Sequence, residues 1–82
     1  PLILAPTGTP GVVWPNGARE AALAAERAGA GFCLSTMSTS RIEDIAKASK
    51  QPIWFQLYVM RDRELAKSMM QRAKAAGCSV LV

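Results

Sequence analysis

Short apolar runs alternate with stretches of helical periodicity along the whole chain, and this alternation most limits the folds it can adopt. The apolar runs centre near residues 3, 33, 55 and 81, so the repeating unit is about 20 to 30 residues long. Strands that alternate with helices form a parallel sheet with right-handed crossover connections. The pattern predicts an α/β fold with about four strands and three helices, and both a doubly wound sheet and an eight-stranded β/α barrel are compatible with it.

Start and stop signals support the three helices. The first is predicted over residues 17–28, where Gly29 provides a C-terminal breaker. Ser40 and Glu43 fit a capping box, which predicts that the second helix starts there. The third is expected to follow an N-cap at Asp62. The segment between the first strand and the first helix, residues 7–16, is predicted to be a loop.

The third apolar run, "QPIWFQLYV" at residues 51–59, carries an amide and a phenol among large apolar side chains. Gln56 and Tyr58 would share one face of a strand with Trp54, while the opposite face is wholly apolar. Because neither face carries a charge, we expect both faces to be covered. A buried amide left unpaired costs about 1 to 3 kcal/mol per group, so Gln56 requires a partner. That partner is either a neighbouring strand or loop, or a polar ligand.

In parallel α/β folds, ligands bind at the carboxyl ends of the strands. This rule points to residues 6–9, 35–38 and 56–60, which are expected to lie together. The loop "APTGTPG" lacks the spacing of a phosphate-binding motif, but Gly8 would let a flat ligand approach the backbone. The neutral hydroxyl of Ser35 and the amide of Gln56 suit a heterocycle with an imide edge better than a metal. With no base nearby, they do not suit nucleophilic catalysis.

Composition argues against several other functions. The net charge of +4 comes from basic residues scattered over the predicted helices, which does not indicate a nucleic-acid partner. The chain contains no His, and Cys33 and Cys78 lack the paired spacing of a zinc or redox site, so we expect reduced, buried thiols and no metal. No apolar run approaches membrane-spanning length, and no signal-peptide pattern opens the chain. The expected location is the cytoplasm.

Four segments, "LILAPTG", "FCLSTMSTSRIEDIA", "PIWFQLYVMRDRE" and "RAKAAGCSVLV", resemble in order and spacing the FMN-dependent 2-hydroxy-acid dehydrogenase and oxidase family. The resemblance covers essentially all 82 residues. It implies a parallel β/α barrel of the TIM type, with FMN across the carboxyl ends of the strands. Residues 1–82 would then be an incomplete part of one FMN hydroxy-acid dehydrogenase domain, with about four of the eight strands.

The resemblance also assigns roles to individual residues. It implies that FMN is bound by Pro6, Thr7, Gly8, Ser35 and Gln56, and that the substrate is contacted by Tyr58. On this interpretation Gln56 is paired by the cofactor rather than by protein. Gly8 stands where oxidases of the family tend to carry Ala, and Met37 where some carry Trp. The first feature favours a dehydrogenase, whereas Met37 is better explained as a loop or packing residue.

The expected activity of the whole protein is therefore oxidation of an L-2-hydroxy acid, such as lactate, to the 2-oxo acid. The electron acceptor would be a cytochrome or quinone, and the whole protein a homo-oligomer, with peripheral attachment to the inner face of the membrane as a further option. The base, a His, is expected downstream, so residues 1–82 alone should be inactive and poorly folded. The alternatives are an oxygen-using oxidase of the same family and a non-catalytic β/α module that binds flavin or phosphate.

Overall fold

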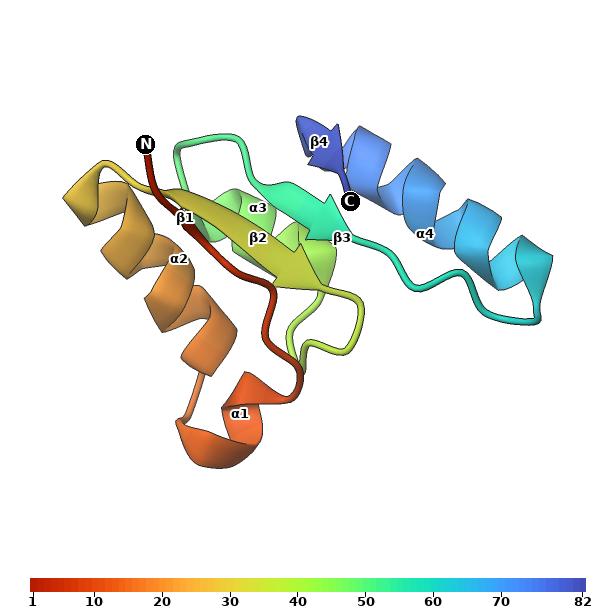
Figure 1. Ribbon diagram of the computed structural model, residues 1–82, viewed down its shortest axis with the longest axis horizontal. Coiled ribbons are helices and arrows are strands. Elements are labelled where there is room, and N and C mark those ends of the chain that lie inside the picture. Colours follow the sequence, from red (N-terminus) through yellow and green to blue (C-terminus); the bar gives the residue numbers. More distant parts are fainter.

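A four-stranded parallel sheet organises the computed structural model, which describes residues 1–82 (Figure 1). The strands lie in the order β1-β2-β3-β4, so each pairs with its neighbour along the chain. The elements are β1 (Ile3–Leu4), α1 (Pro10–Val13), α2 (Gly17–Ala28), β2 (Gly31–Ser35), α3 (Ile42–Ala48), β3 (Trp54–Gln56), α4 (Arg63–Ala75) and β4 (Val80–Leu81). The predicted α/β fold with four parallel strands is confirmed, and a short fourth helix, α1, is added to the three predicted ones.

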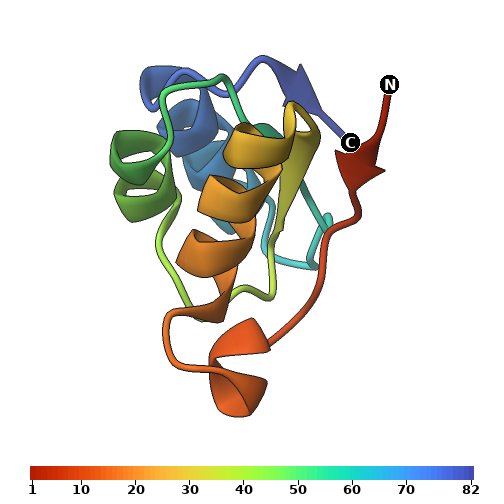
Figure 2. The same cartoon turned by 90° about the vertical axis from the view of Figure 1, so that its left-hand side faces the viewer.

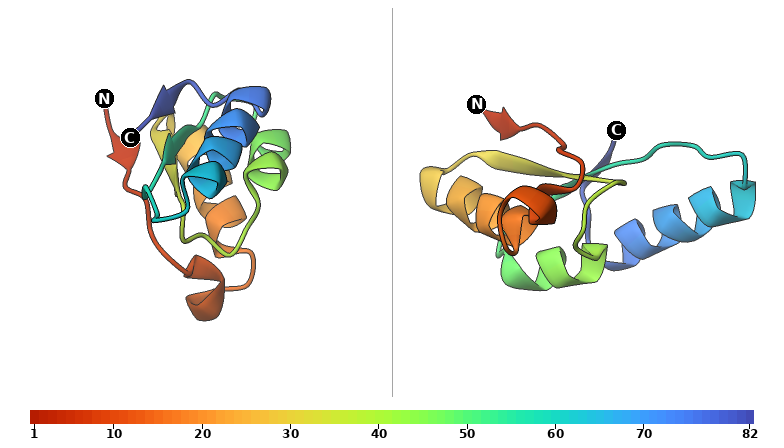
Figure 3. Two further views of the ribbon diagram at one scale, coloured as in Figure 1. Left: turned by 90° about the vertical axis from the view of Figure 1, so that its right-hand side faces the viewer. Right: turned by 90° about the horizontal axis from the view of Figure 1, so that it is seen from below.

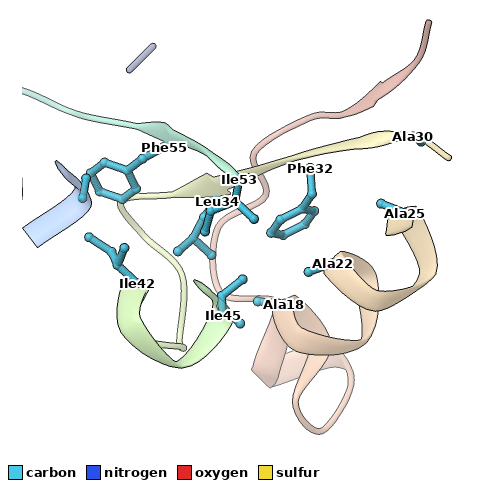
Figure 4. Packing of buried hydrophobic residues seen from close by; sticks show 11 residues of the cluster. Ala18, Ala22, Ala25, Ala30, Phe32, Leu34, Ile42, Ile45, Ile53 and Phe55 are labelled. Atoms are coloured by element: carbon cyan, nitrogen blue, oxygen red, sulfur yellow. The ribbon is translucent and has the colours of Figure 1, made fainter. Parts of the chain in front are cut away.

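The three longer helices cover only one face of the sheet. Seen from the side and from below, α2, α3 and α4 lie on one side of the strands and no helix lies on the other (Figures 2 and 3). Phe32, Leu34 and Phe55 point from the strands toward this layer and form one cluster with Ala22 of α2 and Ile45 of α3 (Figure 4). Alternate strand positions thus meet the apolar stripe of each helix, and this layer contains the core.

The opposite face of the sheet carries the polar residues of interest. Cys33 pairs with Trp54, and Ser35 with Gln56, in the register of β2 and β3. Trp54 and Gln56 are only half-buried because no layer covers this side of β3. Tyr58 lies beyond the end of β3 and is 58% exposed. The expectation that both faces of the third strand are covered is therefore wrong.

Two predictions about the loops that precede helices are corrected. Helix α1 forms within the loop predicted for residues 7–16; a proline begins it, and Thr9 just before it has φ 47°. The capping box is wrong, because α3 begins one residue later, with Arg41 as its N-cap and no side-chain cap. The carboxylate of Glu43 instead accepts hydrogen bonds of 2.7 and 2.8 Å from Arg72 of α4.

The other helix-end signals are confirmed. Asp62 caps α4, since its Oδ1 accepts hydrogen bonds from the backbone N–H groups of Glu64 and Leu65 at 3.0 and 3.2 Å. Gly29 ends α2 with φ 69°, a left-handed conformation that glycine adopts without a steric penalty. None of the helices is both long and apolar enough to cross a bilayer.

Candidate functional site

The carboxyl ends of the first three strands meet at one edge of the sheet, as predicted. The backbone N–H of Thr9, after β1, donates to the carbonyl of Met37 at 2.8 Å. The backbone N–H of Thr36, after β2, donates to the carbonyl of Gln56 at 3.0 Å. Residues 6–9, 35–38 and 56–60 therefore form one surface, which we call the strand-end site.

The β1 loop contributes exposed backbone to this site. Pro6, Thr7 and Gly8 are all exposed, and the only side-chain hydrogen bond among them is a long one of 3.4 Å from Thr7 Oγ1 to the carbonyl of Ala5. A Cβ added to Gly8 would lie 3.4 Å from the Cβ of Met37, which is ordinary van der Waals contact. The loop thus presents a small, uncharged surface against which a flat group could pack.

Ser35 and Gln56 form the polar centre of the site. Ser35 is buried; its Oγ accepts a 3.0 Å hydrogen bond from the N–H of Met37 and donates to Gln56 Oε1 at 3.4 Å. The same Oε1 also accepts from the backbone N–H of Thr36 at 3.4 Å. The expectation that Gln56 lacks protein partners is thus wrong for its oxygen, because the side chain sits at the last paired position of β2 and β3. Its amide nitrogen donates to no protein group.

Tyr58 follows the end of β3 and leaves its ring largely in the open. Its backbone N–H donates to Thr36 Oγ1 at 3.0 Å, whereas its phenol oxygen makes no hydrogen bond. The backbone is therefore fixed while the polar end of the side chain is free. A phenol placed in this way can either donate or accept a hydrogen bond from a ligand.

Sequence reasoning included Thr36 in the strand-end stretch 35–38 but gave it no role of its own. Its hydroxyl donates to the carbonyl of Gln56 and accepts from the N–H of Tyr58, which joins the two predicted ligand-binding residues. The only sequence signal was its place in the hydroxyl-rich run "STMSTS" directly after the second strand. Composition could not tell which of these hydroxyls faces the neighbouring strand.

The strand-end site holds no charged side chain, and the two thiols of the chain lie outside it. Cys33 is buried behind it, and burial raises the pKa of its thiol. Burial, and to a smaller extent the proximity of Cys33, raises the pKa of the half-buried Cys78 thiol. Both cysteines are free, as expected, but only Cys33 is buried, so the expected burial of Cys78 is wrong. Because the pKa values of both thiols are raised, both remain protonated at neutral pH. The site can therefore orient a ligand through neutral hydrogen bonds but offers no acid or base of its own.

Comparison with known sequences matches the whole chain to a single family. The model of the family described as FMN-dependent dehydrogenase matches residues 1–82. L-lactate dehydrogenase of Haemophilus influenzae (strain PittEE) is 52% identical over 82 residues, which are 100% of this chain and 22% of that protein. L-lactate dehydrogenase of Acinetobacter baumannii (strain ATCC 17978) is 50% identical over the same length, 21% of that protein. The chain thus spans about a fifth of the length of these relatives.

Solved structures agree with this match. A soluble mutant of the membrane-associated (S)-mandelate dehydrogenase from Pseudomonas putida superposes with a TM-score of 0.94 at 44% identity, over 99% of this chain and 23% of that one. Mandelate oxidase with (S)-4-hydroxymandelic acid superposes with a TM-score of 0.93 at 33% identity, over 99% of this chain and 22% of that one. The arrangement of strands and helices is therefore shared with both a dehydrogenase and an oxidase.

Proposed function

The chain belongs to the FMN-dependent dehydrogenase family, and from this premise we propose that the whole protein oxidises an L-2-hydroxy acid such as lactate to the 2-oxo acid. The predicted family, its cofactor FMN and the partial barrel are confirmed by the family match and the superpositions. The observation that carries the proposed activity is the 50–52% identity to L-lactate dehydrogenases over the whole chain. Residues 1–82 would be an incomplete part of one such domain.

The strand-end site fits a flavin. Gln56 has an amide nitrogen without a protein acceptor, held in place because its oxygen accepts from Ser35 and Thr36. Gly8 leaves room at the first strand end, beside exposed backbone of Pro6 and Thr7. We assign these residues to FMN: Pro6, Thr7 and Gly8 pack against it, and Ser35 and Gln56 hydrogen-bond its polar edge. When bound, FMN supplies the two-electron acceptor for the hydroxy acid.

Tyr58 is assigned to the substrate. Its exposed phenol lies beyond Gln56 on the same segment, so it can hydrogen-bond a small polar molecule placed against the cofactor site. It orients the substrate and does not remove its proton. Because the chain contains no His and the strand-end site no charged residue, the base and the groups that bind the carboxylate come from the rest of the protein.

Two classes of electron acceptor are compatible with this site. Gly8 and the higher identity to dehydrogenases favour a cytochrome or quinone. An oxygen-using oxidase is the second candidate because mandelate oxidase superposes with a TM-score of 0.93. Peripheral membrane attachment is included in the proposal because an (S)-mandelate dehydrogenase described as a monotopic membrane protein is 44% identical. We further propose that the whole protein is a homo-oligomer.

The test uses the whole protein loaded with FMN. Its visible spectrum is recorded without oxygen, and L-lactate or (S)-mandelate is added in parallel samples. Bleaching of the flavin bands by L-lactate is expected, and reoxidation by a quinone rather than oxygen would identify the dehydrogenase. Tyr58→Phe should retain FMN yet be reduced about tenfold more slowly at low substrate, since one hydrogen bond is lost. A flavin that neither acid reduces would refute the substrate class, and a folded protein that binds no FMN would refute the site.

A further inference from the structure

Thr36 contacts both of the residues assigned above to cofactor and substrate. Its backbone N–H donates to the carbonyl of Gln56 at 3.0 Å and lies 3.4 Å from the side-chain Oε1 of the same residue. Its hydroxyl donates to the same carbonyl and accepts a 3.0 Å hydrogen bond from the N–H of Tyr58. One residue of the β2 end is thus tied to the cofactor residue and to the substrate residue of the β3 end.

The hydroxyl takes the place of a missing backbone partner. In a continuing parallel pair, the N–H of Tyr58 would donate to a carbonyl of the neighbouring strand. Strand β2 instead turns at Thr36 and Met37, and the turn is closed by a 3.1 Å hydrogen bond from the N–H of Ser38 to the carbonyl of Ser35. Since the backbone of β2 leaves the sheet here, the Thr36 side chain provides the acceptor.

The neighbouring hydroxyls have other partners. Ser38 Oγ accepts from the N–H of Ser40 at 3.1 Å, and Thr39 Oγ1 accepts from the N–H of Gly11, also at 3.1 Å. Ser35 Oγ contacts Gln56 only through the side-chain oxygen. Thr36 is therefore the hydroxyl of this loop that holds the Tyr58 backbone, and its β-branched side chain has few rotamers in which to lose that contact.

We propose that Thr36 is a positioning residue whose hydroxyl fixes Tyr58 relative to Gln56. The phenol that contacts the substrate is thereby held at a constant distance from the amide that contacts the cofactor. The identities of substrate and cofactor rest on the proposed function. The positioning itself rests on the hydrogen bonds of Thr36 and can be measured in the protein without either molecule.

The experiment compares three variants of the whole protein. Thr36→Val removes the hydroxyl and keeps the shape, Thr36→Ser keeps the hydroxyl, and Thr39→Val is the matched control because its hydroxyl binds Gly11 rather than Tyr58. Amide hydrogen exchange at Tyr58 is measured without flavin, and the KM for L-lactate is measured with FMN bound. Thr36→Val should speed exchange and raise KM by about five- to tenfold, the effect of one ordinary hydrogen bond, with FMN affinity changed less than KM. Thr36→Ser and Thr39→Val should stay within about twofold of the wild type.

The outcomes separate the inference from the proposed function. The positioning role would be overturned if Thr36→Val left amide exchange at Tyr58 unchanged. It would also be overturned if Thr36→Ser raised the exchange rate and KM as much as Thr36→Val does. If Thr36→Val does not fold, Thr36→Ala removes the same hydroxyl with less volume and is judged by the same exchange measurement. A wild-type protein that binds no FMN or oxidises no hydroxy acid refutes the proposed function, while the exchange comparison still decides the role of Thr36.

Discussion

At the scale of the residue, Gln56 presents two atoms to two different partners. Its oxygen accepts from Ser35 and Thr36, and its nitrogen is left for a ligand. Gln56→Glu keeps an oxygen for the two protein donors but replaces the donor nitrogen with a second oxygen, whereas Gln56→Leu removes both. We expect both variants of the whole protein to lose FMN affinity by about tenfold or more, as for a lost hydrogen bond whose partner stays buried. Titration of FMN fluorescence measures this.

Glu at this position is the informative variant. If the amide mattered only for its bonds within the protein, Gln56→Glu would bind FMN as tightly as the wild type, and the assignment of the nitrogen to the cofactor would fail. Thermal unfolding without FMN is the control, because it reports whether the bonds to Ser35 and Thr36 survive each substitution.

Sequence reasoning singled out Ser35, Gln56 and Tyr58 because polar side chains at the ends of otherwise apolar strands are unusual and costly, and their roles toward ligands stay predictions. It placed Thr36 within the stretch 35–38 but could not assign it a role, because that role depends on where the second strand leaves the sheet. Nor could it foresee that the Gln56 oxygen is occupied, since this follows from the register that pairs Ser35 with Gln56. Register is a tertiary property, and the strand pattern alone leaves it open.

At the scale of the element, α4 depends on its first residues. Asp62 Oδ1 accepts from two backbone N–H groups that have no partner within the helix. Asp62→Ala in the whole protein should lower the free energy of unfolding by about 1 kcal/mol, and Asp62→Asn, which keeps the acceptor, by much less. Denaturant unfolding measures both losses, with one slope of free energy against denaturant concentration used for the wild type and the two variants. Equal losses for Ala and Asn would mean that charge, and not the cap, is what α4 requires.

The contact between α3 and α4 should depend on pH. The paired guanidinium of Arg72 lowers the pKa of Glu43 from 4.5 to about 2. Because the folded-state pKa is depressed, the stabilisation is present in full above the ordinary pKa and is lost as pH falls from about 4.5 through about 2. The wild type should therefore have a higher melting temperature than Glu43→Gln near neutral pH, and this difference in melting temperature should disappear in acid. The pair is substantially solvent-exposed, so added salt should also reduce the difference in melting temperature between the two proteins.

The comparison with Glu43→Gln isolates this carboxylate from its neighbour. Asp44 also has a lowered pKa, through its hydrogen bonds to Arg41, but that pair is present in both proteins. A difference in melting temperature that stays constant from neutral pH to about pH 2 would contradict the role of the Glu43–Arg72 pair.

Helices and strands were predictable where local signals decide them, and not where tertiary contacts do. Asp62 and Gly29 act on their own helix ends, and both predictions are confirmed. The carboxylate of Glu43 could either cap α3 or pair with Arg72, which lies 29 residues away in sequence, and in the structure it pairs with Arg72. Helix α1 is four residues long and is held from outside, by the bond from the N–H of Gly11 to Thr39. No local pattern reports such a contact.

At the scale of the whole molecule, the described chain leaves much apolar surface uncovered. The sheet has two edge strands, β1 and β4, and one face without a helical layer (Figure 3). Leu2, Val80, Leu81 and Val82 at these edges are between 37% and 70% exposed. An open strand edge with apolar side chains is a template for pairing with another chain. The relatives, of which this chain spans about a fifth, have much more sequence with which to cover such surface.

The last prediction follows from this exposed surface. Residues 1–82 expressed alone should self-associate and unfold without a sharp transition, because pairing between β1 and β4 edges of different copies removes the unpaired backbone groups from water. Analytical ultracentrifugation over a concentration series measures the association, and calorimetry measures the cooperativity of unfolding. Leu2→Lys and Val82→Lys place charges at the two edges and should reduce association, whereas Lys67→Glu on the exposed face of α4 should not. A monomeric, cooperatively melting product of 82 residues would show that the single helical layer and its core are sufficient without the rest of a barrel.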